Sequence, residues 1–323
     1  MKEKIHVIMD NHLARLFLIF LLALVSMSVL VPSTFLTVVN FKSMSVQLPE
    51  LGFLSIAAAM VLISGGIDLS VTGTAIFAGI TSALILRNCG GGEAPFGAVV
   101  AAVLTALVIG TLCGTLNAVL VTKLQIAPML ATLGTMNLFT GLGIVLSEGS
   151  AIAGFPETFQ KIGNGSILGI PVPLVLFILA ISFMAFLLNR TKYGFNLYMY
   201  GTNSIASFYS RVNNTKVVFF TYIFSGVISS IAGIIIVSRI NTAKADYGSS
   251  YGLQALVVAV LGGISPSGGS GKALGLLFSI MTLQIISSGF NLLHVNSFIK
   301  DLTWGVLLVV VMLWNQKRNG KKE

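Results

Sequence analysis

Charged residues are scarce in this sequence of 323 residues. Asp, Glu, Lys and Arg make up 9% of the chain, whereas 55% is hydrophobic and the mean hydropathy is +0.94. Soluble domains carry about 25% charged residues, so a soluble globular protein is excluded. The few charges separate ten uncharged runs that cover most of the chain: 16–41, 51–67, 69–86, 94–122, 124–147, 162–189, 217–238, 247–271, 273–299 and 302–316.

Cysteine and histidine are also too few for most metal proteins and many enzymes. Cys89 falls in an expected loop and Cys113 in an expected span, which implies no disulfide framework. His6, His12 and His294 lie far apart in the sequence, and no set of His, Cys, Asp and Glu has the spacing of metal ligands. We therefore expect no catalytic residue and no metal in this chain.

One glycine-rich segment resembles a phosphate-binding loop but lacks two residues that the motif requires. Residues 268–272 read Gly-Gly-Ser-Gly-Lys. A phosphate-binding loop needs a glycine five residues before the Gly-Lys pair, and Ser or Thr after the lysine. Pro266 and Ala273 occupy those two positions. The sequence predicts a tight cytoplasmic turn here, and no cofactor is expected in this chain.

The uncharged runs have the length of membrane-spanning helices. About 20 mostly apolar residues cross a bilayer as a helix, and only the runs 51–67 and 302–316 need flanking residues to reach that length. The apolar stretch Leu16–Val31 is followed by further spans, which favours a retained helix over a cleaved signal peptide. The sequence predicts an all-α polytopic membrane protein with roughly ten helices in one domain, residues 1–323.

The net charge of +9 follows from topology. Basic residues concentrate in cytoplasmic loops. With a cytoplasmic N-terminus and ten spans, 13 of the 19 Lys and Arg residues lie inside, which supports cytoplasmic location of both termini. No nucleic-acid partner is expected, and the lipid bilayer is the expected surrounding. The six basic residues on the outside are Lys42, Arg87, Lys161, Arg239, Lys244 and Lys300.

Residues 64–70 read Ser-Gly-Gly-Ile-Asp-Leu-Ser between two apolar runs. A carboxylate at membrane depth is costly and usually faces a bundle interior, a cavity or an interface. Glycines beside it favour a helix break or a re-entrant turn, where protein or water satisfies the backbone. The alternative is a short cytoplasmic loop, in which Asp68 would cost little.

The same glycine pattern recurs later in the chain. Gly65, Gly66 and Ser70 belong to the pattern Gly-Gly-Ile-x-x-Ser, which returns at Gly262 and Gly263. Transporters are often built from repeats with broken helices at matching positions. A pseudo-repeat is therefore predicted, parallel in a ten-span count and inverted if one span is miscounted. Chance is the alternative in a chain with 34 glycines.

The longest polar segment, residues 189–216, carries four basic residues and no acid. Within it, Ser204–Val212 is predicted to form a short amphipathic helix with Asn203 or Ser204 as its N-cap. Such a helix either lies on the lipid interface or docks into a groove of a partner. Its predicted apolar face consists of Ile205, Phe208, Tyr209 and Val212.

Polar residues inside the predicted spans are mostly neutral. Hydroxyl and amide groups either join helices by hydrogen bonds or line a path for a neutral polar solute. The scarcity of buried charge argues against an ion-coupled pump, which needs carboxylates or histidines along its path. The residues predicted for a translocation path are Asn117, Thr132, Asn137, Gln284 and Ser287.

The block Ile63–Val71 closely resembles the signature of permease subunits in ribose-type sugar ABC importers. The likeness continues in the expected order over most of the chain, from about residue 50 to 310. The further matching segments are Ile126–Thr135, Thr191–Gly194, Tyr200–Asn203, Ser225–Gly226, Ala232–Ile234, Ala259–Gly263, Gly268–Gly269 and Gly271.

The resemblance implies a transmembrane permease of the bacterial cytoplasmic membrane. It implies three partners: a cytoplasmic ABC ATPase that binds ATP and magnesium, a second permease subunit, and an external solute-binding protein. Residues 190–216 then contain the coupling segment. The residues expected to contact the ATPase are Ser204, Ile205, Phe208, Tyr209, Arg211 and Val212, and the signature residues are Gly65, Gly66, Asp68, Ser70, Gly262 and Gly263.

Two departures from the family pattern concern cargo and pairing. Gly252 and Gln254 stand where family members usually carry acidic residues, and Ser207–Val212 replaces an alanine-rich coupling segment. Either change fits a divergent subunit that pairs with a paralogous permease, or a cargo other than ribose. The leading hypothesis is an importer subunit for a monosaccharide or related neutral solute. The alternatives are a stand-alone secondary transporter or facilitator, and a non-transporting membrane scaffold.

Overall fold

The computed structural model describes residues 12–248 and 250–319. Eight of its helices are long and apolar enough to cross a membrane within this described part. This confirms an all-α polytopic membrane protein. The eight helices are α2 (His12–Leu30), α3 (Val38–Ile63), α4 (Val71–Asn88), α5 (Phe96–Thr122), α6 (Pro128–Leu146), α8 (Val172–Arg190), α11 (Asn214–Ile240) and α13 (Ala273–Leu292).

The other elements lie between or after these eight helices. The run 247–271 holds only the 11-residue helix α12 (Tyr251–Leu261), followed by a loop, and the run 302–316 lies in α14 (Ser297–Asn319). β1 (Ile152–Ala153) pairs antiparallel with β4 (Thr242–Ala243), and β2 (Ser166–Ile167) with β3 (Ile170–Pro171). The remaining short helices are η1 (Gly91–Glu93), α7 (Glu157–Asn164), α9 (Lys192–Thr202) and α10 (Ser204–Tyr209).

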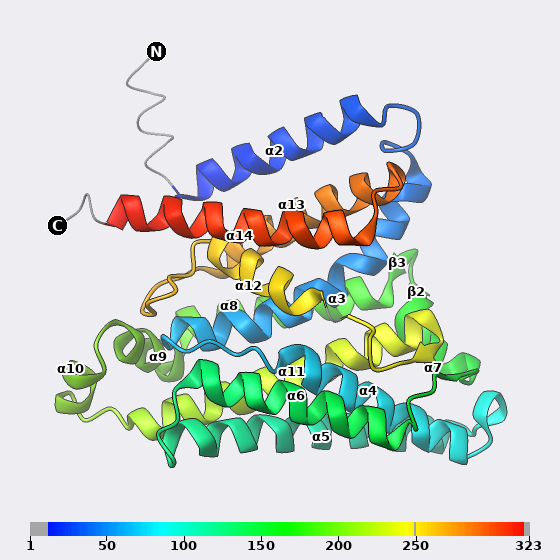
Figure 1. Cartoon of the computed structure of the whole chain (residues 1–323), viewed down its shortest axis with the longest axis horizontal. Coiled ribbons are helices and arrows are strands. Elements are labelled where there is room, and N and C mark those ends of the chain that lie inside the picture. The colour runs from blue at the N-terminus through cyan, green and yellow to red at the C-terminus, as the bar shows by residue number, and fades with distance from the viewer. Residues whose placement is uncertain (1–11, 249, 320–323) are drawn as a thin grey trace.

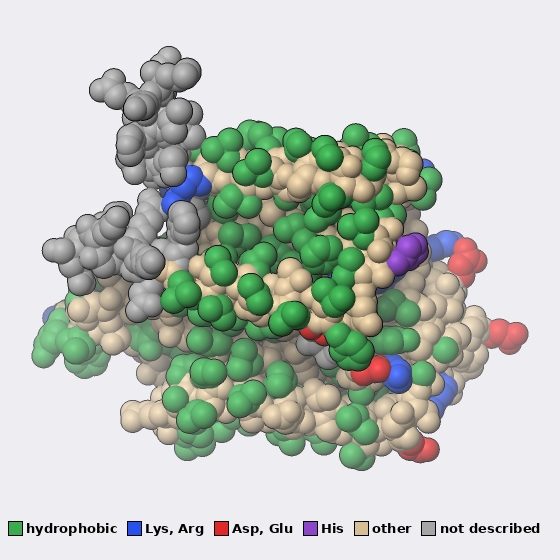
Figure 2. All heavy atoms as spheres, turned by 45° about the horizontal axis from the view of Figure 1, so that its top comes forward, with side chains coloured by type: hydrophobic (Ala, Val, Ile, Leu, Met, Phe, Trp, Pro, Cys, Tyr) green, Lys and Arg blue, Asp and Glu red, His purple; other side chains and the backbone are tan. Residues whose placement is uncertain are grey.

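The long helices run side by side between two ends of the molecule (Figure 1). The end that carries α9 and α10 also carries the start of α2 and the end of α14, and we call it the α10 end. The opposite end carries α7 and the β2–β3 hairpin, and we call it the α7 end. Figure 2 shows hydrophobic side chains over much of one face, as expected for helices that face lipid tails.

Helix α3 is the centre of the bundle. Every residue from Pro49 to Ile63 is buried, and the helix packs against α8, α11, α12 and α13. Small residues let other pairs of helices approach closely. A Cβ atom at Gly110 of α5 would lie 2.5 Å from the carbonyl oxygen of Gly226 in α11, so only glycine fits this crossing.

A buried ion pair ties three helices together. Glu50 of α3 is 1% exposed and pairs with Arg239 in the last turn of α11. The Tyr251 hydroxyl of α12 donates to Glu50 Oε2 at 3.0 Å. The sequence places Arg239 among the outside basic residues and gives no sign of a partner for it. The pair joins positions 189 residues apart in the chain, which no local pattern reveals.

Glu50→Gln is expected to lower the midpoint of thermal unfolding in detergent, because Arg239 loses the charge that compensates its partial burial. Removing one partner of a buried pair costs about 3–5 kcal/mol. The control is Glu157→Gln, which breaks the exposed pair with Lys161 on α7 and should change the midpoint little. Equal midpoints for the two variants would contradict the structural role of Glu50.

Candidate functional site

The chain between α3 and α4 leaves the helix at a glycine cap. Gly65 has φ +80°, a left-handed conformation that favours glycine. Its N–H donates to the Leu62 carbonyl at 2.9 Å, and the Gly66 N–H donates to the Val61 carbonyl at 3.2 Å. These two bonds form a Schellman cap. Residues 64–70, which we call the first loop, are therefore held in a fixed path from α3 into α4.

Asp68 lies at the end of this loop and is 6% exposed. Its Oδ1 accepts hydrogen bonds from the Ser70 N–H at 2.9 Å and the Ser70 hydroxyl at 2.6 Å. Its Oδ2 accepts from the hydroxyl of Ser225, in α11, at 2.7 Å. A buried carboxylate needs such donors to offset its lost hydration. The position fits a broken helix and not a solvated cytoplasmic loop.

The hydrogen bonds around Asp68 extend into two further helices. Asn117 of α5 donates through Nδ2 to the Ser70 hydroxyl at 2.7 Å and accepts from the Thr135 hydroxyl of α6 at 2.6 Å. Thr132 of α6 accepts from the Leu69 N–H at 3.1 Å. We call Asp68, Ser70, Asn117, Thr132, Thr135 and Ser225 the Asp68 network.

The structure separates the residues that were predicted to line one path. Asn117 and Thr132 lie together in the Asp68 network. Asn137 is exposed on α6, where its Nδ2 bonds to the Leu133 carbonyl of its own helix at 3.1 Å. Gln284 and Ser287 lie on α13. Gln284 Nε2 is buried without a hydrogen-bond partner among the described residues, and Ser287 is half-buried.

Helix α12 ends in the same kind of cap as α3. Gly263 has φ +83°, and its N–H donates to the Val260 carbonyl at 3.1 Å. The next N–H, of Ile264, donates to the Ala259 carbonyl at 3.1 Å. Gly263 is therefore the structural counterpart of Gly65, one residue away from the register of the sequence repeat, which pairs Gly65 with Gly262. We call residues 262–272 the second loop.

The predicted coupling helix is present but shorter than expected. It was predicted to reach Val212, and α10 ends at Tyr209. Arg211 has φ +61°, which ends the helix and turns half-buried Val212 toward the core. Asn203 is the N-cap, since its Oδ1 accepts from the N–H groups of Ile205 and Ala206 at 3.0 Å each.

Three of the four predicted apolar side chains of α10 point outward. Ile205, Phe208 and Tyr209 are 68%, 69% and 80% exposed. Helix α10 projects from the rest of the bundle at its end (Figure 1). The predicted apolar face of α10 is thus exposed to the surroundings in the described part of the chain.

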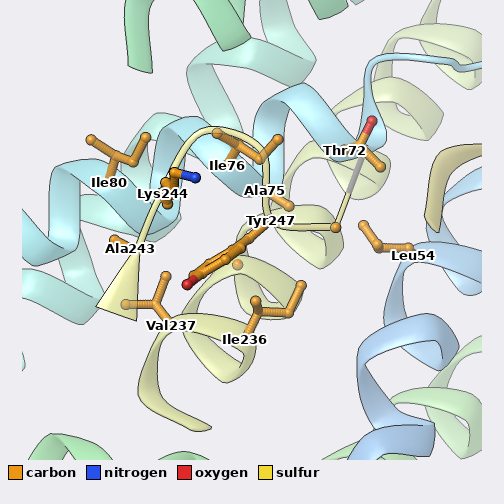
Figure 3. A pocket seen from close by; sticks show the side chains of 12 residues that line it. Leu54, Thr72, Ala75, Ile76, Ile80, Ile236, Val237, Ala243, Lys244 and Tyr247 are labelled. Carbon is orange, nitrogen blue, oxygen red and sulfur yellow. The ribbon is translucent and has the colours of Figure 1, made fainter. Parts of the chain in front are cut away.

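A largely apolar pocket lies nearer the α7 end and was not predicted. It is formed by α3, α4, α11 and residues 243–248, and its empty space, open solvent included, is about 340 Å³. Figure 3 shows the Tyr247 ring lying among the lining side chains, with Thr72 and Lys244 as further polar groups. The hydrogen bond and charge of Asp246 raise the pKa of Lys244, which favours its charged form.

Asp68→Ala should strongly lower the midpoint of thermal unfolding, because it leaves the Ser70 and Ser225 donors without their acceptor. Each buried group left unsatisfied costs about 1–3 kcal/mol. Asp68→Asn should cost less, because an amide still accepts through Oδ1 and donates to Ser225. Asn137→Ala, at an exposed position, is the control and should change little. An Asp68→Ala midpoint equal to that of the control would refute the structural importance of the network.

Comparison with known proteins gives the family of this fold. Residues 40–313 match a family model described as "Branched-chain amino acid transport system / permease component". The chain is 35% identical over 303 residues to the ribose import permease protein RbsC of Bacillus subtilis (strain 168), covering 93% of this chain and 91% of that protein.

Two further relatives are autoinducer 2 import system permease proteins LsrD. That of Photorhabdus temperata is 29% identical over 293 residues, with 84% of this chain and 85% of the relative covered. That of Yersinia enterocolitica is 33% identical over 273 residues, with 81% and 79% covered. No solved structure gives a significant match. The resemblance seen in the sequence motifs is thus confirmed, and the chain belongs to the permease family of ribose-type sugar ABC importers.

Proposed function

We propose that this permease imports a monosaccharide or a related small neutral solute, driven by a cytoplasmic ATPase that docks on α10. The observation that carries the proposal is the exposed apolar face of α10, because a permease without a phosphate loop of its own needs a surface for an ATPase. Ile205, Phe208 and Tyr209 offer that surface. The first residue of α11 holds α10 in place, since Asn214 donates to the Ser204 carbonyl at 2.8 Å and accepts from the Ser207 hydroxyl at 2.7 Å.

The distribution of charge supports the orientation in the membrane. Arg190, Lys192, Arg211 and Lys216 surround α9 and α10, so the positive-inside rule makes the α10 end cytoplasmic. Both termini are then cytoplasmic, and the α7 end faces outward. We assign the chain to the bacterial cytoplasmic membrane, with an external solute-binding protein docking at the α7 end.

The class of solute follows from the relatives and from the interior. The named relatives import ribose and autoinducer 2. Most polar groups buried in the bundle are hydroxyls and amides, which bind neutral polar molecules without a fixed counter-charge. Asp68 already has its oxygens engaged by Ser70 and Ser225. A neutral sugar-like solute is therefore favoured over an ion.

The departure from the family pattern at Gly252 and Gln254 bears on cargo more than on pairing. Gly252 packs against α4, where a Cβ atom would lie 3.3 Å from Thr72 Cγ2, and Gln254 is buried. Neither residue is exposed on the surface of the subunit. The second permease subunit is a copy of this chain or a paralogue.

The direct test is uptake into proteoliposomes that contain the permease and its ATPase, with ATP enclosed and the binding protein outside. Labelled ribose is the first solute, and autoinducer 2 is the second. We expect uptake that requires ATP and the ATPase. Uptake by the permease alone, driven by an ion gradient, would instead establish a secondary transporter, and uptake of neither solute would refute the proposed cargo.

Phe208→Ala combined with Tyr209→Ala should reduce the ATPase that co-purifies with the permease by about tenfold or more, since buried aromatic anchors carry much of the energy of an interface. The permease itself should unfold at an unchanged temperature, because both side chains are exposed. Phe186→Ala, which removes an exposed aromatic ring from α8, is the matched control. Equal ATPase recovery from the double variant and the control would refute docking at α10.

A further inference from the structure

The last turn of α9 meets both glycine loops at one point. Gly201 of α9 is so close to the carbonyl oxygen of Ile63 and to the backbone nitrogen of Gly269 that a Cβ atom would overlap them. A Cβ atom at Gly268 would lie 2.7 Å from the Gly65 nitrogen and 2.8 Å from the Gly201 carbonyl oxygen. Three backbones, one from α9 and one from each loop, therefore pack against each other without side chains between them. We call this contact the glycine junction.

Hydrogen bonds hold the glycine junction together. The Gly269 N–H donates to the Ile63 carbonyl at 2.8 Å, which joins the second loop to the end of α3. The Tyr198 hydroxyl of α9 donates to the Gly271 carbonyl at 2.7 Å, which joins α9 to the second loop. Burial raises the pKa of Tyr198, so this hydroxyl keeps its proton.

The junction is directly connected to the docking helix. Only Asn203 separates α9 from α10, and it bonds to both helices. Its N–H donates to the Met199 carbonyl of α9 at 3.0 Å, while its Oδ1 caps α10. A displacement of α10 therefore moves the end of α9 as well.

On its other side the junction leads to the buried polar groups. The first loop runs from the junction at Gly65 to Asp68 in three residues, and Asp68 is fixed to α11 through Ser225. The second loop connects the end of α12 to the start of α13. Backbone atoms in direct contact have no side-chain rotamers with which to absorb a shift, and packed contacts tend to move between discrete arrangements.

We propose that the glycine junction transmits the movement of ATPase-bound α10 to both broken-helix loops at once, with Gly201 as the positioning residue. The proposal rests on the proposed function, specifically on ATPase docking at α10. It assigns to Gly201, Tyr198 and Gly269 a role in coupling ATP hydrolysis to transport, separate from the role of Phe208 and Tyr209 in binding the ATPase.

The test compares Gly201→Ala with Gly141→Ala. Both glycines lie in helices, but a Cβ atom at Gly141 of α6 meets open space. The measurements are the amount of co-purified ATPase, the rate of ATP hydrolysis and the amount of solute taken up per ATP hydrolysed. For Gly201→Ala we expect normal ATPase binding and a fall of about tenfold in uptake per ATP, within the range of allosteric coupling. Gly141→Ala should behave as the unmodified protein.

Tyr198→Phe tests the same contact if Gly201→Ala is not recovered as folded protein. It removes only the hydroxyl that bonds to Gly271, and a smaller loss of uptake per ATP is expected with unchanged ATPase binding. A merely structural role would lower the unfolding temperature and leave uptake per ATP unchanged. Normal coupling in Tyr198→Phe, together with normal coupling in any recovered Gly201→Ala, would overturn the proposal.

Hydrogen exchange in the unmodified complex tests the relay without any substitution. Addition of a non-hydrolysable ATP analogue should change amide exchange in residues 64–70 and 262–272 together with residues 198–212. Changes confined to 204–216 would overturn the relay but leave ATPase docking intact. A chain that binds no ATPase at all would refute the proposed function itself, so the two failures are distinguishable.

Discussion

The cost of placing a carboxylate inside an apolar bundle governs the architecture around α4. Asp68 is stabilised because the chain breaks its helix after Ile63 and presents the Ser70 N–H and hydroxyl to the same oxygen, while Ser225 reaches the other oxygen from α11. Asn117 and Thr135 then fix Ser70 from α5 and α6. Four segments that are distant in sequence thus converge on one charge. A polar network of this kind is stable only when each member has its partners.

Close approach of backbone segments is a second feature of this bundle, and glycine makes it possible. Gly110 and Gly226 allow α5 and α11 to cross closely, and Gly65, Gly201 and Gly268 allow three chain segments to meet near the α10 end. In a lipid environment, helix association depends on packing and hydrogen bonds more than on a hydrophobic driving force. The glycines therefore give a bundle that is tightly packed at the glycine junction, next to α10. The exposed face of α10 lies next to this packed region, and under the proposed function this is the surface on which the ATPase acts.

Local sequence patterns predicted what depends on local chemistry. Hydropathy located the spans, because about 20 apolar residues are needed to cross a bilayer. The charge-free run 247–271 holds the short helix α12 and a glycine loop, so its length alone did not reveal where its helix ends. The spacing of Ile205, Phe208 and Tyr209 predicted the apolar face of α10. The end of the helix was missed because Arg211 adopts a left-handed conformation that usually requires glycine. Contacts between distant residues were missed: Glu50 with Arg239, Asp68 with Ser225, and the meeting of Gly201 with Gly269 all depend on tertiary packing that spacing cannot reveal.

The proposed function requires a separate ATPase bound at the α10 end of this membrane subunit. The most direct measurement is a mild-detergent purification of the tagged chain from its native membrane, followed by identification of its partners by mass spectrometry. We expect recovery of a cytoplasmic ABC ATPase in stoichiometric amount, with a second permease subunit when the complex is heteromeric. Recovery of this chain alone, under conditions that preserve a known ABC importer, would contradict it.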